Sequence, residues 1–547
     1  MDISEKPLAV ISYYEDMISA RSNNITKKEA KVENTYLTLE KIYIGSTDAK
    51  NELLYGDSGE IENYKDNFVI PPSLGIDAFR KKQRYFITGL KGIGKTALLR
   101  YIDISMSDED IISNFILFKT DIDDNIKSRI SQLSRIKLCG DNSDDYGGKD
   151  DDFEIAWRWF IYKQILLITN KYENFFIQDV SFKKFKAIID SVDSESNPSW
   201  KVFPTIKRGM ININISSVLA IELNLDFMSK KKEVRFGELV GQLDETFKEL
   251  KINKGRLNLF FDELELNYNS SKQYKKDARL IRDLIVSIEK INAVAKKNRL
   301  DICIYAAIRS EVLHVVEALG KEINKPIADF GIEILWNRPG VSAEQQPLLS
   351  IIEQRINNSR KKISLSELDS NSMWSTYFPN TILGKNPQTY ILHNSWYRPR
   401  DIIRLLKIAQ DQFPESKNFS TNVLEPIRKK YSSDSWVEMS EELKAKYSAN
   451  QIAAIKKIFY GTQQIWPIGE LKIHINSLAE NSSLVRDLIK NSDVETVLDD
   501  VYRVGIVGNI NRKTSPYKMR FVFRGDAERI SNQDIYIHNA LLAYLSI

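Results

Sequence analysis

The chain has little of what an extracellular or membrane protein needs. Only two of its 547 residues are cysteines, Cys139 and Cys303, and their wide separation argues against a disulfide framework. The first residues include acids where a secretory signal needs basic side chains, and no apolar run approaches the length of a membrane span. These features predict a soluble protein in a reducing, cytoplasmic compartment.

An excess of charge of one sign is also missing. The 78 Lys and Arg residues nearly balance the 74 Asp and Glu residues, so the formal net charge is only +4. A nucleic-acid-binding surface would therefore have to be a local patch. The histidines are few and scattered, which argues against a His/Cys metal cluster and against nuclease chemistry built on one: His314, His393, His474 and His538.

What the chain does have is a glycine loop between a β-forming run, 85–88, and a helix-forming run, 97–102. The loop matches G-x-x-x-x-G-K-[ST], the pattern whose backbone N–H groups wrap phosphates at a helix N-terminus. We expect Lys95 to neutralise the β- and γ-phosphates and the Thr96 hydroxyl to ligate Mg²⁺. The predicted cofactors are ATP and Mg²⁺, and the predicted nucleotide-binding residues are Gly89, Leu90, Lys91, Gly92, Ile93, Gly94, Lys95, Thr96 and Ala97.

A second chemical signal lies at 257–263, an apolar run that ends in two acids. Downstream of a phosphate loop, this pattern predicts that Asp262 holds the Mg²⁺ shell and that Glu263 polarises the attacking water. Glu265 is the alternative for the water-positioning role. The long stretch between Thr96 and Asp262 predicts a large, mostly helical insertion in the nucleotide-binding core.

Arginines follow at two further places. Arg309 ends the apolar run 301–308, where a cation can reach the γ-phosphate and distinguish ATP from ADP; the alternative is a surface arginine that opens the next helix. Arg398, Pro399 and Arg400 open another helix. They are typical of a lid that closes over a nucleotide, with Arg400 on the phosphates and Pro399 near the base. The alternative is an ordinary helix-start signal, in which proline takes the first helical position.

The motifs GLKGIGKT, FFDELE, AAIRSE and YRPRDIIRLL, in this order, resemble a bacterial family of P-loop ATPases often encoded in phage-defence neighbourhoods. That family is similar to the AAA+/STAND/KAP branch, and the resemblance spans roughly residues 40–547. It implies that Arg309 matches the STAND-type sensor arginine and that 398–400 match the lid motif. Many STAND members carry Asp-Asp where this chain has Asp262 and Glu263, so stronger hydrolysis is expected here.

The resemblance implies an α/β fold with a P-loop NTPase core of the AAA+/STAND-like type, a helical insertion, a helical lid and a C-terminal winged helix. The expected boundaries are 1–80 for an N-terminal mixed segment, 81–335 for the core with its insertion at about 124–250, 336–445 for the lid, and 446–547 for the winged helix. The segment 503–529 has seven basic against two acidic residues, which predicts a basic face. Its nucleic-acid-binding candidates are Arg512, Lys513, Lys518 and Arg520.

Three functions remain open at the level of the sequence. The first is an ATPase that acts as a switch or motor on DNA or a partner protein, in antiviral defence. The second is a STAND-like scaffold that oligomerises on a trigger and recruits a separate effector protein. The third is a DNA-binding regulator that a nucleotide merely stabilises. A homo-oligomer is expected in which an arginine acts on the neighbouring subunit's site, with candidates Arg279, Arg282 and Arg299.

Overall fold

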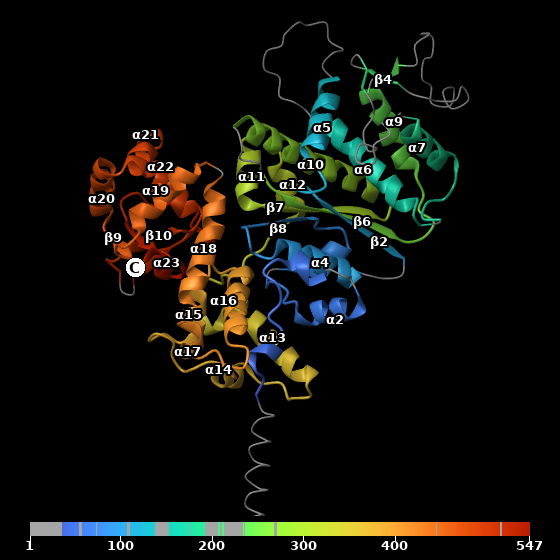
Figure 1. Cartoon of the computed structure of the whole chain (residues 1–547). Helices are drawn as coiled ribbons and strands as arrows, with labels where there is room; N and C mark the ends of the chain where they lie inside the picture. Colours follow the sequence, from blue (N-terminus) through green and yellow to red (C-terminus); the bar gives the residue numbers. More distant parts are fainter. Residues whose placement is uncertain are drawn as a thin grey trace, which may run out of the picture. The chain divides into compact units, whose positions relative to one another are not determined.

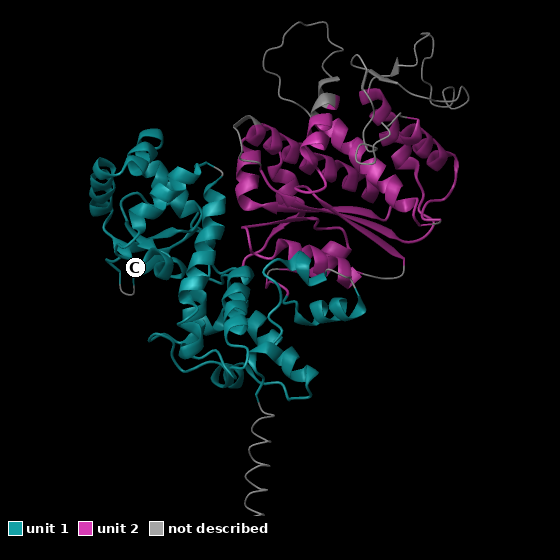
Figure 2. Ribbon diagram, viewed as in Figure 1, with its two compact units in different colours: residues 1–69, 336–547 teal, residues 70–335 magenta. Residues whose placement is uncertain are grey.

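The computed structural model describes residues 36–53, 57–72, 74–106, 110–136, 153–172, 174–191, 206–207, 210–212, 233–234, 236–266, 271–444, 446–514 and 517–547. The chain forms two compact units, Met1–Val69 with Trp336–Ile547, and Ile70–Leu335 (Figure 2). The described part of the N-terminal segment therefore groups mainly with the C-terminal half. The expected domain boundaries remain predictions.

The unit Ile70–Leu335 is built on a five-stranded parallel sheet. Its strands lie in the order β2-β6-β7-β1-β8, and the two that carry most of the sequence motifs, β1 and β6, are separated by β7. The expected α/β core is confirmed. The strand bounds are Phe86–Gly89 for β1, Ile111–Leu117 for β2, Arg256–Leu264 for β6, Ile302–Arg309 for β7 and Gly331–Glu333 for β8.

Apolar runs explain why these segments form a central sheet. β1 is buried along its whole length and β7 at every position but its last, as expected for parallel strands covered on both faces. In Figure 1, α4 lies on one face and α6 and α10 on the other. The helices of this unit are α3 Ile76–Arg80, α4 Lys95–Met106, α5 Asp124–Ile136, α6 Glu154–Thr169, α7 Val180–Asp190, α9 Phe236–Glu249, α10 Ser271–Lys297, α11 Ser310–Glu317 and α12 Asn324–Phe330.

The described part of the insertion is mostly helical, and its helix α6 packs against α10 of the core. Trp157 of α6 is fully buried, and its indole N–H donates to the Leu280 carbonyl of α10 at 2.8 Å. A small antiparallel sheet also lies in this stretch, with β3 Ile206–Lys207, β4 Met210–Asn212 and β5 Glu233–Val234. None of the helices that the structure describes is both long and apolar enough to cross a membrane.

Helices dominate the first part of the other unit. The amide of Gln410 on α16 donates to the carbonyls of Leu39 and Ile42 at 2.6 and 2.8 Å, which ties the N-terminal segment to this helical part. The elements up to residue 443 are η1 Leu39–Lys41, η2 Ala49–Leu53, α2 Ser58–Asn67, η4 Ala343–Gln345, η5 Pro347–Leu349, α13 Ser350–Lys362, α14 Ser370–Tyr377, α15 Pro387–His393, α16 Pro399–Gln412, α17 Thr421–Leu424 and α18 Arg428–Leu443.

In the last part of the chain, α19, α20 and α21 pack on one another, and α22 contacts an antiparallel sheet of order β11-β10-β12-β9. Residues 518–520 form β11, which pairs with β10, and the winged helix remains a prediction. The elements are α19 Ala449–Phe459, β9 Ile465–Trp466, α20 Ile468–Asn481, α21 Ser483–Asn491, α22 Val494–Arg503, β10 Val507–Asn511, β11 Lys518–Arg520, η6 Val522–Arg524, β12 Asp534–Ile537, η7 Asn539–Leu541 and α23 Leu542–Leu545.

Phe521, directly after β11, packs against Gly508 of β10. Phe521 is 3% exposed, and a Cβ on Gly508 would lie 2.4 Å from its ring, so the strand pair closes over the aromatic side chain where glycine leaves room. Phe521 and Phe523 therefore belong to the core of this part, whereas Gly525, Ala527 and Glu528 are exposed.

Candidate functional site: a phosphate loop facing two acids

The glycine loop lies between β1 and α4, as the sequence predicts. Gly92 and Gly94 have φ angles of 76° and 104°, a left-handed backbone that glycine adopts without a steric penalty. α4 begins at Lys95, so the loop residues Gly89, Leu90, Lys91, Gly92, Ile93 and Gly94 precede the positive end of a 12-residue helix, and Thr96 and Ala97 lie in its first turn.

Lys95 is folded back onto this loop. Its side chain is buried, and Nζ donates to the carbonyl oxygens of Gly89 and Leu90 at 2.8 Å each. A buried ammonium needs hydrogen-bond acceptors, and here the loop's own backbone supplies them. Phosphate oxygens are stronger acceptors for a charged donor, so an anion in the loop would compete for the same ammonium.

Asp262 faces the start of α4 from β6. The side chain is almost completely buried, and burial raises its pKa, while the Glu263 N–H, the Thr96 hydroxyl and the Lys95 charge act in the opposite direction. Oδ1 accepts from the Glu263 N–H at 2.8 Å, and Oδ2 has no hydrogen-bond partner among the residues that the structure describes. A buried carboxylate oxygen without a partner, next to a hydroxyl, provides the oxygen ligands that Mg²⁺ prefers. The residues therefore fit the predicted metal.

Glu263 lies at an irregularity in the same strand. The β6–β7 register shifts between Phe261 and Leu264, and Glu263 has φ of 57°, a left-handed conformation that is uncommon for a residue other than glycine. The strand does not stop at Glu263, as the sequence suggested, but continues to Leu264. A bulge redirects a side chain, and strained backbone of this kind clusters at functional sites.

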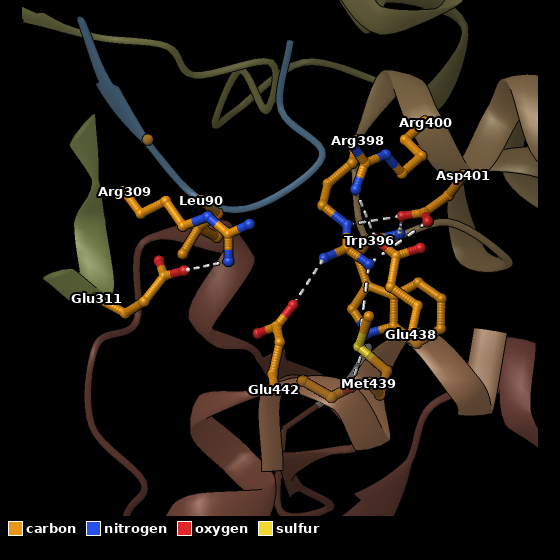
Figure 3. A network of polar contacts seen from close by, with 12 residues as sticks. Leu90, Arg309, Glu311, Trp396, Arg398, Arg400, Asp401, Glu438, Met439 and Glu442 are labelled. Atoms are coloured by element: carbon orange, nitrogen blue, oxygen red, sulfur yellow. Dashed lines mark hydrogen bonds and ion pairs between the residues drawn. The ribbon is translucent and has the colours of Figure 1, made fainter. Parts of the chain in front are cut away.

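Arg309 lies beside the loop at the end of β7. In the parallel pairing of β1 with β7, Arg309 is the register partner of Gly89, the first loop residue. Its guanidinium forms ion pairs with Glu265 and, at 3.6 Å, with Glu311 (Figure 3 labels Arg309 and Glu311). The structure thus brings Arg309 to the loop and pairs it with Glu265, for which the sequence predicted an alternative water-positioning role.

The residues of the expected lid motif lie in the other unit. Arg398 is buried and pairs with Asp401 at 2.8 Å and with Glu442 at 3.9 Å (Figure 3). Pro399 is the first residue of α16. Arg400 donates to Glu438 and to the Thr47 carbonyl at 3.0 Å each. Nucleotide contacts by Pro399 and Arg400 remain predictions.

The candidates for an arginine acting on a neighbouring subunit differ in their surroundings. Arg282 is fully buried and bonded to Asp283 at 2.8 Å and to the Leu319 carbonyl at 2.7 Å, and this burial argues against a contact with another chain. Arg279 is half-buried, and Arg299 is exposed just after α10. The structure therefore leaves Arg279 and Arg299 for this role.

Acidic partners surround the predicted basic face. Arg512 pairs with Asp534 at 2.7 Å and Arg520 with Asp526 at 3.4 Å, whereas Lys513 and Lys518 are exposed. Further pairs join Arg503 to Asp500 and Arg529 to Glu495 and Asp499. Several of these acids lie outside the segment 503–529, which explains why the local sequence overstated its positive charge.

Comparison with known proteins matches part of the chain. Residues 346–440 match the family model described as the FunZ-associated C-terminal helical domain. A search of curated proteins finds no match. The structure is similar to the Aeropyrum pernix ORC2 protein (ADPNP–ADP complexes), with 11% identity, 89% of this chain and 94% of that chain covered, and a TM-score of 0.28. It is also similar to C. elegans PCH-2, with 11% identity, 70% and 68% covered, and a TM-score of 0.23.

Proposed function

We propose that this chain is an AAA+-like P-loop ATPase that binds and hydrolyses ATP with Mg²⁺. One observation carries the proposal: Thr96 at the start of α4 and the buried Asp262 of β6 face each other beside Lys95. Thr96 and Asp262 would hold the metal, and Lys95 would contact the β- and γ-phosphates. Bound Mg²⁺ supplies charge neutralisation of the phosphates.

The neighbouring strand ends supply the remaining roles. Glu263 is the base that orients and deprotonates the attacking water, and Arg309 meets the terminal phosphate. The position of β7 between β1 and β6 supports this assignment, because all three carboxyl ends lie at one edge of a parallel sheet. That edge is where open α/β sheets bind ligands.

The wider role in this proposal is a conformational switch or motor. The match of residues 346–440 to a named helical domain supports a separate helical lid after the core, and the arrangement of 446–547 supports a winged helix. The acidic partners of Arg512 and Arg520 favour a protein partner over DNA for that winged helix. A role in antiviral defence rests on the sequence resemblance.

The experiment compares wild type with two variants. Lys95→Ala should lose hydrolysis and weaken ATP binding by at least about tenfold, because a charge-assisted contact to phosphate disappears. Glu263→Gln should still bind ATP, while turnover falls on the order of 10²-fold. Equilibrium binding and steady-state phosphate release measure the two effects. Wild-type protein that binds no ATP in the presence of Mg²⁺ would overturn the proposal.

A further inference from the structure

We infer that Glu265 is a positioning residue that holds Arg309 away from the terminal phosphate until ATP arrives, and so reduces the preference for ATP over ADP. The inference rests on the proposed function of the site. It replaces the water-positioning role for Glu265 with a competition between two anions, the Glu265 carboxylate and the γ-phosphate, for one guanidinium.

The contacts of Arg309 support this role. Its guanidinium pairs with Glu265, the residue after β6, and at 3.6 Å with Glu311 of α11, while its backbone is in register with Gly89 of the phosphate loop. The arginine is therefore next to the loop and already occupied. Glu265 is itself 3.9 Å from Lys119, a cation that follows β2 and is able to pair with the carboxylate when Arg309 leaves.

The bulge in β6 separates the three acids of this strand end. Asp262 faces Thr96 and Lys95, and Glu263 takes the left-handed conformation between them, while Glu265 turns to Arg309. A water-positioning carboxylate must be available to the water. Glu265 is bound to a guanidinium instead, so its chemistry suits an electrostatic partner better than a base.

The competition has a definite thermodynamic direction. ADP brings no γ-phosphate, so Arg309 keeps its pair with Glu265 when ADP binds. ATP brings a further anion with several acceptor oxygens, and forming the Arg309–phosphate contact costs the Glu265 pair. Removing the Glu265 charge removes that cost for ATP alone. Because the pair is partly exposed, the gain is limited to about fivefold in affinity.

The test measures the binding of AMPPNP, a non-hydrolysable ATP analogue, and of ADP by calorimetry with Mg²⁺. Glu265→Gln should raise AMPPNP affinity about fivefold and leave ADP affinity unchanged. Glu265→Asp, which keeps the charge, should behave closer to wild type. Glu317→Gln is the matched control, because Glu317 is a partly exposed carboxylate of α11 that pairs with His314 at 3.8 Å and not with Arg309. It should change neither affinity.

A double variant separates this role from a structural one. Arg309→Gln should remove the effect, so that Glu265→Gln adds nothing to AMPPNP affinity in the Arg309→Gln background. Lower AMPPNP affinity in Glu265→Gln, or an equal change for AMPPNP and ADP, would overturn the inference while the proposed function stands. A wild-type protein that binds neither nucleotide would overturn the proposed function itself.

Discussion

At the scale of single residues, His538 couples the stability of its unit to pH. The ring is buried, stacks on Trp396 with centroids 4.1 Å apart, and accepts from the Ala540 N–H at 3.3 Å through Nδ1. Burial lowers the pKa of His538 to about 3, and the charges of Arg398 and Arg524 act in the same direction, against the attraction of Asp401. The folded protein therefore holds this histidine neutral.

The sign of the pH dependence follows from this lowered pKa. Between the unfolded pKa of about 6.5 and the folded value, the unfolded chain binds more protons, so stability is complete above pH 6.5 and falls as the pH drops. At pH 5, the lowered pKa of His538 should reduce the free energy of unfolding by about 2 kcal/mol relative to its value above pH 6.5. Hydrogen exchange of the β10 and β12 amides at pH 7 and pH 5 measures this loss of stability.

A matched pair of variants checks the assignment to His538. His538→Gln should reduce the difference between the two pH values, and His314→Gln, which alters an exposed histidine, should not. His393 will leave a residual slope, since burial and nearby Lys385 lower its pKa to about 4. An unchanged slope in His538→Gln would show that protonation of this ring does not limit the stability of the unit.

Some residues of the candidate nucleotide site could be predicted from the sequence, and others could not. The glycine loop was recognisable because its chemistry depends on residues next to one another in the chain. The approach of Thr96 to Asp262 was foreseeable only as part of that pattern. The pairing of Glu265 with Arg309 was not, because 44 positions separate them and the contact depends on the strand order and on a bulge.

At the scale of elements, the bulge in β6 gives a prediction about stability and turnover together. Glycine tolerates the left-handed backbone of Glu263, whereas a β-branched residue does not. Glu263→Gly should therefore be about as stable as wild type, and Glu263→Val should lose roughly 1–3 kcal/mol. Neither variant should hydrolyse ATP. Thermal unfolding and phosphate release check both, and equal stability of the two variants would contradict a strained bulge.

The β10–β11 turn gives a second prediction at this scale. If duplex DNA binds here, Lys513 and Lys518 are the exposed cations, while Arg512 and Arg520 already pair with acids. Two phosphate contacts predict an affinity loss of only about tenfold between 50 and 200 mM salt, against several hundredfold for five contacts. Fluorescence anisotropy with labelled duplex measures this slope.

Alanine variants of the same turn distinguish the contributions of its individual cations to DNA binding. Replacing Lys513 and Lys518 should abolish the salt-dependent part of DNA binding, and replacing Arg512 should have little effect. Duplex binding that depends neither on the salt concentration nor on Lys513 and Lys518 would indicate that DNA binds to another surface. The sequence could not show the pairing, because Asp534 lies on β12, outside the segment 503–529.

At the scale of the whole molecule, one segment links the parts of the unit that contains the expected lid. The Trp396 indole donates to the Gly505 carbonyl at 2.7 Å, Arg398 pairs with Asp401, and Arg400 donates to the Thr47 carbonyl. The residues of the sequence motif around Pro399 thus stabilise the packing of their own unit. A local pattern cannot distinguish that use from contact with a nucleotide, because both require buried or paired arginines at a helix start.

Assembly provides the last prediction, which concerns the arginine acting between subunits. Lys95→Ala loses its own nucleotide site but keeps Arg299, and Arg299→Ala keeps the site but loses the exposed arginine. If Arg299 completes the neighbouring site of a homo-oligomer, an equimolar mixture of the two inactive variants should recover about a quarter of wild-type turnover, because random assembly places the right neighbours together at that frequency. Arg282→Ala should not restore turnover when it is mixed with Lys95→Ala. Breaking the buried pair of Arg282 with Asp283 costs roughly 3–5 kcal/mol, so this variant should be destabilised. Arg279→Ala in the same mixing assay tests the other remaining candidate. Full turnover by Arg299→Ala alone would remove Arg299 from the intersubunit role and leave Arg279.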